Sequence, residues 1–264
     1  MNFVLTGHKG LIGSALLKRL EARGDTAIDL IDIRGDSPVD IRNLKHWHIY
    51  SPVDVLYHLA SFCKINQSIK CLPKTFEHNV RGTYEVMNFC RRNNIPKIVF
   101  TSSTRVLYPE KNPYTASKVY GEEIVKAYEM EYVIIRPSTV YGPHWDETGR
   151  LVHIWVTAAL RGEELKIYGD ENKTLDFTYI DDFVDAFLKC SETTNAEYNI
   201  GTGREIKLVD VAEHIIKVVG KGTIGFYPPE KLQPQNVVID TDVPCNTDVF
   251  TGLDKTIEFY RSRV

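Results

Sequence analysis

Tyr114 and Lys118 stand four positions apart in the segment "NPYTASKVYGEE", where Pro113 marks the expected start of a helix. On a helix, this spacing places the phenol and the ammonium on adjacent turns of one face. An unperturbed tyrosine has a pKa near 10 and is a weak base at neutral pH, but a neighbouring cation stabilises its phenolate form. The pair therefore indicates a general base that removes a proton from a sugar or alcohol hydroxyl.

A run of hydroxyl side chains, "FTSST", ends a predicted strand upstream of this helix. Ser103, with Ser102 as its neighbour, is placed to hold the reacting oxygen and to relay its proton. The alternative for each feature alone is structural, with a serine that caps a helix and a tyrosine buried in the core. A glycine-rich loop and an acidic residue, described below, precede the serines and the Tyr-x-x-x-Lys pair along the chain. This combination favours a catalytic role over a structural one.

The glycine loop is the segment "TGHKGLIGS", between a predicted strand and a predicted helix. Gly7 permits a tight turn, Gly10 lets the backbone approach a pyrophosphate, and Gly13 lets the helix pack closely on the strand. Together with Leu11 and Ile12 at the start of the helix, these glycines predict a dinucleotide site.

Asp32 ends the next strand, nineteen residues after Gly13. A carboxylate at this position accepts both hydroxyls of an adenosine ribose and repels the 2′-phosphate of NADP, which predicts NAD. Arg34 follows closely and leaves NADP open, and a solvated loop acid is the alternative for Asp32. Asp40 and Ile41 in "VDIRN" could flank the adenine, although this is also ordinary turn and helix-cap sequence.

These groups need strands and helices that alternate along the chain. The predicted strands span residues 2–7, 26–33, 53–60, 97–103 and 131–138, and the predicted helices span 11–24, 75–94 and 114–129. This rhythm predicts an α/β protein with a Rossmann-type doubly wound parallel sheet and a small C-terminal substrate lobe. We expect residues 1–142 plus about 174–200 to form the dinucleotide-binding domain, and about 143–173 plus 201–264 to form the lobe.

The composition excludes several kinds of partner. The 264 residues carry a formal net charge of −3, which leaves no basic field for nucleic acid and no polybasic patch for a membrane. No apolar run approaches the ~20 residues that span a bilayer, and the first residues turn glycine-rich too soon for a signal peptide. The 5 widely spaced cysteines predict reduced thiols in the cytoplasm. His46 and His48 lack a third ligand at a matching spacing, so we expect no metal.

Several segments carry a resemblance to a known family: "TGHKGLIGS", "VDVLYHLAS", "NVRGT", "FTSSTRVLY", "PYTASKVYGE", "RPSTVYGP" and "YNIGTG". In this order they resemble the extended short-chain dehydrogenase/reductases, the NAD-dependent sugar epimerase/dehydratase family, over nearly the whole chain. The resemblance implies tightly held NAD, a nucleotide-sugar substrate and a catalytic set of Ser103, Tyr114 and Lys118. It also implies further dinucleotide contacts, at Leu59, Ala60, Ser61, Asn79, Pro137 and Ser138, with Lys118 on the nicotinamide ribose.

The chain departs from the family pattern at several positions. Thr104 and Arg105 replace the Asp-Glu pair that dehydratases of the family carry after the catalytic hydroxyl, which disfavours a 4,6-dehydratase. Leu175 stands where an arginine normally grips the pyrophosphate of the substrate, and a second such arginine is missing near "KLQPQNVVID". Arg204 and Lys231 could replace these arginines, but Arg150 and Lys173 are the favoured replacements. The residues expected at the substrate are Ser103, Tyr114, Thr139, Arg150 and Lys173.

The leading expectation is an NAD-dependent nucleotide-sugar epimerase, in which hydride leaves a sugar carbon, the keto sugar turns, and hydride returns to its other face. A reductase or dehydrogenase with net turnover of NAD(P)(H) would use the same residues. A non-catalytic NAD-binding regulator is the third alternative, against which the intact catalytic set argues.

Members of the family usually form homodimers through two helices of each subunit, one of them the Tyr-x-x-x-Lys helix. On this helix Val119, Tyr120, Ile124 and Val125 form a mixed apolar stripe, and residues 75–92 would supply the other helix. The alternative is that the stripe only faces the sheet. We expect a homodimer.

Overall fold

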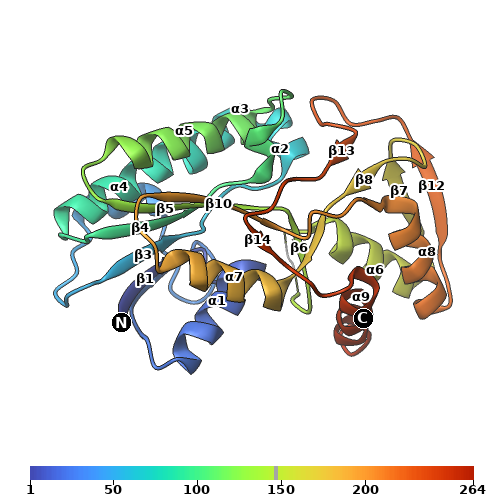
Figure 1. Ribbon diagram of the computed structural model, residues 1–264, viewed down its shortest axis with the longest axis horizontal. Coiled ribbons are helices and arrows are strands. Elements are labelled where there is room, and N and C mark those ends of the chain that lie inside the picture. Colours follow the sequence, from blue (N-terminus) through green and yellow to red (C-terminus); the bar gives the residue numbers. More distant parts are fainter. Residues whose placement is uncertain (146–147) are drawn as a thin grey trace. The chain divides into compact units, whose positions relative to one another are not determined.

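The computed structural model describes residues 1–145 and 148–264 (Figure 1). The chain divides into two compact units. The first comprises Met1–Pro137 and Phe187–Tyr198, and the second comprises Ser138–Ala186 and Asn199–Val264. The assignment of cofactor and substrate roles to separate domains stays a prediction.

The first unit alternates strands with helices, as the hydrophobic pattern predicts. Its strands are β1 (Asn2–Thr6), β2 (Thr26–Ile31), β3 (Val55–His58), β4 (Lys97–Thr101), β5 (Glu131–Pro137) and the start of β10 (Ala196–Gly201). Its α-helices are α1 (Leu11–Ala22), α2 (Ile65–Lys70), α3 (Leu72–Thr75), α4 (Gly82–Arg92), α5 (Pro113–Ala127) and the end of α7 (Ile180–Ser191). Two short 3₁₀ turns, η1 (Ile41–His46) and η3 (Thr104–Leu107), and a π-helical turn, η2 (Phe76–Arg81), complete it.

The central sheet has seven strands in the order β14-β10-β5-β4-β3-β1-β2, where β14 is Val243–Pro244. The pairs β1–β2, β1–β3, β3–β4 and β4–β5 are all parallel. The predicted Rossmann-type α/β fold is therefore confirmed. Because β2 and β3 lie on opposite sides of β1, the strand order reverses at β1, and ligands of such sheets bind beside the carboxyl ends of the strands at this point.

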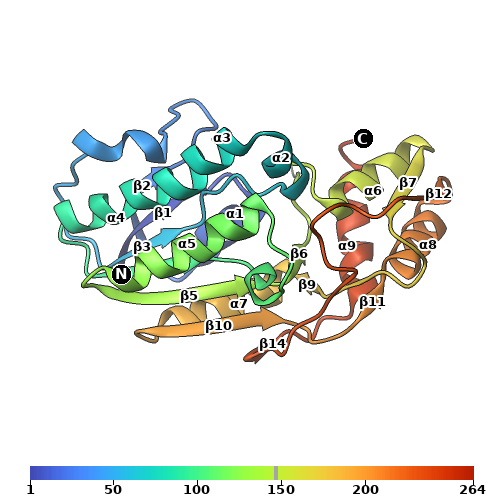
Figure 2. The same cartoon turned by 90° about the horizontal axis from the view of Figure 1, so that it is seen from above.

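Helices cover both faces of the sheet. Figure 1 shows α4 and α5 on one face and α1 and α7 on the other, and Figure 2 shows α5 running along β5. Alternate strand positions and the inner face of α4 supply the core of the first unit. Fully buried members of this core include Val4, Ile31, Leu56, Val86, Met87, Phe89, Ile98, Phe100, Val125 and Ile134.

The second unit is built from short strands and three packed helices. Its helices are α6 (Leu151–Arg161), α8 (Leu208–Val219) and α9 (Val249–Arg261), together with most of α7. Its strands are β6 (Thr139–Tyr141), β7 (Glu164–Tyr168), β8 (Thr174–Leu175), β9 (Phe177–Tyr179), β11 (Ile206–Lys207), β12 (Thr223–Tyr227) and β13 (Asn236–Val237). The pairs β7–β12, β8–β13 and β6–β9 are parallel, and β8–β11 is antiparallel. Within the described residues, no helix is both long and apolar enough to cross a membrane.

Candidate active site

The turn between β1 and α1 has room for backbone only. Gly7 has a φ of +79°, and a Cβ atom on it would lie 2.7 Å from the backbone nitrogen of Ala60. A Cβ atom on Gly13 would lie 2.1 Å from the carbonyl oxygen of Gly7, so α1 packs directly on the turn. Gly10 has a looser setting, with its nearest neighbour at 3.4 Å. The glycines thus bring the N-terminus of α1 to the carboxyl end of β1, an arrangement that binds phosphate groups.

Asp32 lies just after β2, and the residue is 5% exposed. Oδ2 accepts the backbone N–H of Lys9 at 2.9 Å, and Oδ1 accepts that of Arg34 at 3.0 Å. The Arg34 guanidinium also donates to both oxygens. Burial raises the pKa of Asp32, but the hydrogen bonds from Arg34 and Lys9 outweigh burial and leave this pKa below its ordinary value. An ionised carboxylate therefore lies at the end of β2, as ribose recognition requires.

Asp40 and Ile41 both make contacts that stabilise the fold around η1. The Asp40 carboxylate caps η1 by accepting the backbone N–H of Arg42 at 2.9 Å, and it forms an ion pair with the Arg42 guanidinium. Ile41 is buried, and its Cδ1 lies 2.6 Å from the position that a Cβ atom on Gly82 would take. This close contact between η1 and α4 accounts for the glycine at the start of α4.

The segment after β3, which carries Leu59, Ala60 and Ser61, is held by a network of hydroxyl groups and a histidine. Oγ1 of Thr6 accepts the N–H groups of Leu59 and Ala60 at 3.2 and 3.1 Å. Because Thr6 already accepts two hydrogen bonds, its hydroxyl donates to Nδ1 of His58 at 2.8 Å. The Nε2–H of His58 then donates to the Thr83 hydroxyl at 3.0 Å. Burial lowers the pKa of His58 to about 3, so this side chain is uncharged at neutral pH and links Thr6 to Thr83 through hydrogen bonds.

Asn79 lies in the π-helical turn η2, and its amide makes four hydrogen bonds. Oδ1 accepts the Phe62 N–H at 2.7 Å and the Ser61 hydroxyl at 3.3 Å. Nδ2 donates to the Phe62 carbonyl at 3.1 Å and to the Ser117 hydroxyl at 3.0 Å. This amide ties the segment after β3 to α5, and π-helical turns frequently mark functional sites.

The two serines at the end of β4 have different partners. Oγ of Ser103 accepts the backbone N–H of Arg105 at 3.3 Å and thereby caps η3. Helix capping was the structural alternative to a catalytic role for this serine. A hydroxyl that accepts a hydrogen bond as a cap can still donate its own proton. The Ser102 hydroxyl instead donates to Oε1 of Glu122 at 2.5 Å.

Helix α5 starts with an N-cap at Asn112, whose side chain accepts the Thr115 N–H at 2.9 Å, followed by Pro113. Tyr114 and Lys118 then lie on its inner face, 9% and 5% exposed. The backbone N–H of Tyr114 donates to Oγ of Ser68 at 3.2 Å, which anchors the start of the helix on α2.

The Lys118 ammonium is buried at the end of β4. Nζ donates to the carbonyl oxygen of Thr101 at 2.8 Å, and it lies 5.0 Å from the ring centre of Phe100 and 5.9 Å from that of Tyr114. Burial lowers the pKa of Lys118 to about 8, although Cys63 and Glu122 act to raise it. The structure thus brings Lys118, which shares a face of α5 with Tyr114, to the end of β4, directly before Ser102 and Ser103.

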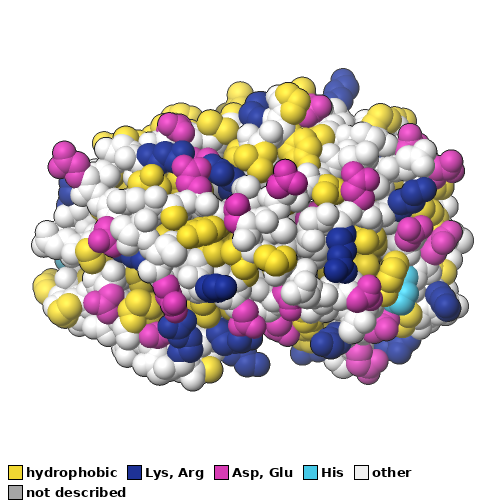
Figure 3. Space-filling model, viewed as in Figure 1, with side chains coloured by type: hydrophobic (Ala, Val, Ile, Leu, Met, Phe, Trp, Pro, Cys, Tyr) yellow, Lys and Arg dark blue, Asp and Glu magenta, His cyan; other side chains and the backbone are white. Residues whose placement is uncertain are grey.

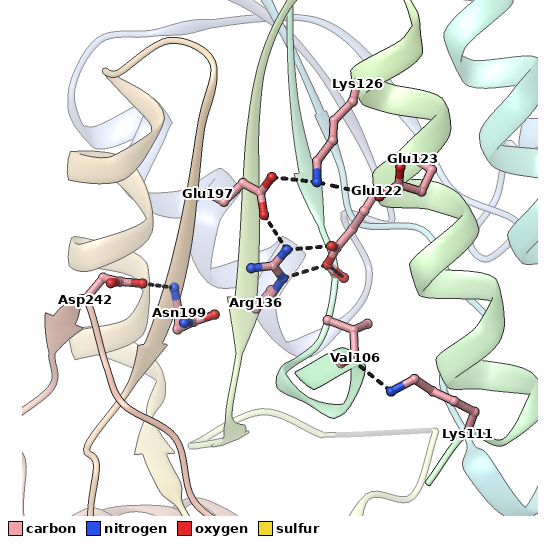
Figure 4. Close-up of polar contacts among 10 residues, drawn as sticks. Val106, Lys111, Glu122, Glu123, Lys126, Arg136, Glu197, Asn199 and Asp242 are labelled. Carbon is pink, nitrogen blue, oxygen red and sulfur yellow. Dashed lines mark hydrogen bonds and ion pairs between the residues drawn. The ribbon is translucent and has the colours of Figure 1, made fainter. Parts of the chain in front are cut away.

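A network of charged groups lies one turn further along α5 (Figure 4). Arg136 of β5 donates Nε to Oε1 of Glu122 at 2.7 Å and Nη2 to Oε2 at 2.5 Å. Arg136 also bonds Glu197 of β10, which pairs with Lys126 at 2.6 Å. The hydrogen bonds that Arg136 donates to Glu122 raise the pKa of Arg136. The network joins α5 to β5 and β10.

Pro137 ends β5 in the first unit, while Ser138 and Thr139 belong to the second unit. There the Ser138 hydroxyl bonds the Thr178 hydroxyl at 2.5 Å, and the Thr139 N–H donates to the carbonyl of Asp176 at 3.0 Å. These contacts hold β6 against β9.

The two basic residues predicted to replace the missing arginines also lie in the second unit. Lys173 is 7% exposed, and its Nζ donates to the carbonyl of Tyr168 at 2.6 Å. Arg150 occupies the N-cap position of α6. Across residues 1–145 and 148–264, no group of three or more His, Cys, Asp or Glu side chains is arranged to hold a metal ion.

The sequence analysis did not single out His58, Thr83, Glu122 or Arg136. All four lie within the quoted motifs: His58 in "VDVLYHLAS", Thr83 at the end of "NVRGT", Glu122 at the end of "PYTASKVYGE" and Arg136 at the start of "RPSTVYGP". Their partners lie 14 to 61 positions away along the chain, which no local pattern reveals.

Comparison with known proteins gives consistent results. The model of the NAD dependent epimerase/dehydratase family matches residues 3–201. A UDP-glucose 4-epimerase of Mycolicibacterium smegmatis is 28% identical, over 100% of this chain and 99% of its own. A putative UDP-glucose 4-epimerase of Methanocaldococcus jannaschii is 30% identical, over 83% of both chains. The crystal structure of a UDP-glucose 4-epimerase from Thermotoga maritima, with UDP-glucose, has the same fold, with a TM-score of 0.89 and 23% identity over 99% of both chains.

Proposed function

The chain belongs to the NAD dependent epimerase/dehydratase family, and we propose that it is an NAD-dependent epimerase that acts on a nucleotide sugar through a transient keto sugar. One observation carries the proposal: α5 packs on the end of β4, so that Tyr114 and Lys118 meet the strand end that bears Ser103. The relatives named UDP-glucose 4-epimerases support the substrate class.

The residues of the first unit fit NAD. The backbone-only turn at Gly7 and Gly13 suits a pyrophosphate, and the ionised Asp32 suits the ribose hydroxyls, which would take the place of Arg34. NAD, when bound, accepts a hydride from the sugar and returns it. The cofactor contacts that we propose are Gly7, Gly10, Leu11, Ile12, Gly13, Asp32, Asp40, Ile41, Leu59, Ala60, Ser61, Asn79, Tyr114, Lys118, Pro137 and Ser138.

In the proposed reaction, Tyr114 removes the proton from the hydroxyl group whose carbon loses hydride. Ser103 donates a hydrogen bond to the same oxygen, since its backbone partner leaves its proton available. The Lys118 ammonium stabilises the phenolate of Tyr114 from within a buried site, where charges interact strongly. Tyr114 then returns the proton when hydride adds to the other face of the keto sugar.

Thr139, Arg150 and Lys173 are the substrate contacts that we propose in the second unit. Because Lys173 is buried on the Tyr168 carbonyl, it would bind a pyrophosphate only after exchanging that partner. The double substitution Arg150→Ala with Lys173→Ala should raise KM for the nucleotide sugar, because each charge-assisted contact contributes about 1.5–3 kcal/mol. The exposed Arg161 of α6 provides a control substitution, and an unchanged KM in the double variant would eliminate both clamps.

The proposed function is tested on the purified protein without added cofactor. Mass spectrometry of the released small molecules should find NAD, and incubation with a panel of UDP sugars should interconvert one pair of epimers. A requirement for added NADPH with net reduction of a sugar would instead establish a reductase. Bound NAD with no turnover of any sugar would favour a regulator.

We also propose a homodimer. Three large apolar side chains on the continuous α3–η2–α4 segment are exposed, Leu72 at 59%, Phe76 at 55% and Tyr84 at 43%. Figure 3 shows hydrophobic side chains along the upper edge of the molecule, where Figure 1 draws α3 and α5. An exposed apolar strip of this kind is typical of a subunit interface.

The stripe predicted on α5 needs one correction. Val125 is fully buried in the core of the first unit, and Ile124 packs partly against the same core. Tyr120 is half-buried beside Tyr84, and burial together with Tyr84 raises its pKa. The interface that we propose therefore depends more on Leu72, Phe76 and Tyr84 than on α5.

We place the protein in the cytoplasm. All five cysteines are free thiols in the structure, and three of them, Cys90, Cys190 and Cys245, are buried. Free thiols are typical of reducing compartments.

A further inference from the structure

Glu122 continues the stripe of α5 that carries the proposed catalytic residues. Tyr114, Lys118 and Glu122 follow one another at intervals of four residues and therefore face the same way. The Glu122 residue is only 5% exposed, and both of its carboxylate oxygens are bound by Arg136. A buried charge is costly unless it is paired, so this placement needs a reason beyond the surface of a helix.

This face of α5 meets three successive residues, the last two of β4 and the residue that follows it. A Cβ atom on Gly121 would lie 2.4 Å from the Phe100 ring, so helix and strand are in direct contact there. Nζ of Lys118 binds the carbonyl of Thr101 at 2.8 Å, and Glu122 accepts the Ser102 hydroxyl. Ser103 is the next residue of the chain.

We infer that Glu122 is a positioning residue: through Ser102 it fixes the end of β4 beside Ser103, and its charge holds Lys118 as an ammonium beside Tyr114. The inference rests on the proposed function, because it assigns Glu122 a part in that reaction. The carboxylate also keeps the Ser102 hydroxyl occupied, which leaves Ser103 as the serine that meets the substrate.

The other groups that face Lys118 come from several elements. His58 at the end of β3 is neutral, Cys63 lies in the segment that follows, and β4 contributes the Thr101 carbonyl and the Phe100 ring. Burial lowers the pKa of Lys118, and Glu122 acts in the opposite direction. Loss of the Glu122 charge should therefore lower this pKa further, and so reduce the fraction of ammonium near neutral pH.

The network allows a substitution that should cost some stability, because it removes one charge of a buried pair, but keep the fold. In Glu122→Gln, the amide oxygen still accepts the Ser102 hydroxyl, and Arg136 still has the carboxylate of Glu197 as a partner. Glu123 gives a matched control, because it is exposed on the same helix and pairs only loosely with Lys126, at 3.6 Å.

The first experiment needs no turnover. Lysine side chains are labelled with ¹³C at Cε, the Lys118 signal is identified by its loss in Lys118→Met, and its titration is followed by NMR in the wild type, Glu122→Gln and Glu123→Gln. We expect the midpoint of Lys118 to fall by roughly one pH unit in Glu122→Gln and to stay in place in Glu123→Gln. An unchanged midpoint in Glu122→Gln would overturn the inference, whether or not the protein proves to be an epimerase.

The second experiment measures kcat against pH on the sugar that the wild type converts. Glu122→Gln should lower kcat on the order of 10- to 100-fold, move the alkaline limb of the profile to lower pH, and leave KM nearly unchanged. The charge-balanced double variant Glu122→Gln with Arg136→Gln should restore stability but not the pH profile. Restoration of both by the double variant would reduce Glu122 to a structural role and sink the inference.

Discussion

The guanidinium group of Arg34 holds both carboxylate oxygens of Asp32, through Nε to Oδ1 at 3.2 Å and Nη2 to Oδ2 at 3.3 Å. Asp32, which favours NAD, and Arg34, which leaves NADP open, thus form one ion pair. The free hydroxyls of a ribose would replace Arg34 as donors to the Asp32 carboxylate. A 2′-phosphate would have to draw Arg34 away from Asp32, and the Asp32 carboxylate would repel this phosphate.

We expect NAD to bind at least tenfold more tightly than NADP, a difference of about 1.4 kcal/mol or more. Arg34→Ala should widen this preference, because it removes the cation that would meet a 2′-phosphate and frees Asp32 for the ribose. Asp32→Asn should narrow it. Calorimetric titration with both dinucleotides measures all three proteins, and equal or tighter binding of NADP by the wild type would contradict the assignment of Asp32.

Gly10→Ala and Gly13→Ala should fail in different ways. The new methyl group in Gly13→Ala would lie 2.1 Å from the Gly7 carbonyl oxygen, so we expect a loss of at least about 1–3 kcal/mol in the free energy of unfolding. In Gly10→Ala the nearest atom is 3.4 Å away, so stability should be retained while NAD affinity falls, because the methyl group meets the pyrophosphate. Urea denaturation and NAD titration of both variants separate the two effects, and normal NAD affinity in Gly10→Ala would argue against the loop as a phosphate site.

Tyr114→Phe should keep the fold and NAD binding but lower kcat on the order of 100-fold or more, because it removes the general base. The backbone contact of residue 114 with Ser68 does not involve the phenol, so the helix start is unaffected. Tyr84→Phe, on the exposed strip, is the control and should turn over normally. Near-full turnover by Tyr114→Phe on the true substrate would show that another group takes the proton.

Lys118→Met should make the protein more stable although less active. Burial lowers the pKa of Lys118 from 10.5 to about 8, so its ammonium destabilises the folded state fully below pH 8. Between about pH 8 and 10.5 the unfolded chain binds more protons than the folded one, and this penalty disappears as pH rises. The gain from the substitution should therefore be on the order of 3 kcal/mol at pH 7 and close to zero above pH 10.5, as urea denaturation would measure.

Lys126→Met provides the opposite case on the same helix. The hydrogen bond from Lys126 to Glu197 raises the pKa of Lys126, so this ammonium stabilises the folded state at neutral pH. Its removal should cost up to about 1 kcal/mol, as expected for a partly exposed pair. Equal effects of the two substitutions at pH 7 would contradict the burial argument for Lys118.

Phe76→Glu should convert the homodimer to a monomer, because it places a charge in the middle of the exposed strip between Leu72 and Tyr84. Ile154→Glu on α6, where the apolar side chain is 48% exposed, is the matched control and should remain dimeric. Light scattering at micromolar concentration decides the matter, and a monomer of 30.2 kDa for the wild type would remove the proposed interface altogether.

The features that could be predicted from the sequence are those that depend on residues close together in the chain. The glycines of the first turn, Asp32 at the end of β2, and Tyr114 with Lys118 on α5 lie in the elements that the sequence predicted. Each is recognisable because a strand, a turn or a helix fixes the relation between residues only a few positions apart.

Contacts between residues that lie far apart along the chain could be identified only from the folded structure. Nothing in a periodicity shows that Arg34 would turn back to cover Asp32, that Val125 would face the core, or that Asn79 would join the segment after β3 to Ser117. The partners of Glu122 are Ser102, just after β4, and Arg136 of β5, 20 and 14 positions away. Only the packing of α5 on the sheet brings these groups together, because a buried charge is stable only where another element supplies its counter-charge.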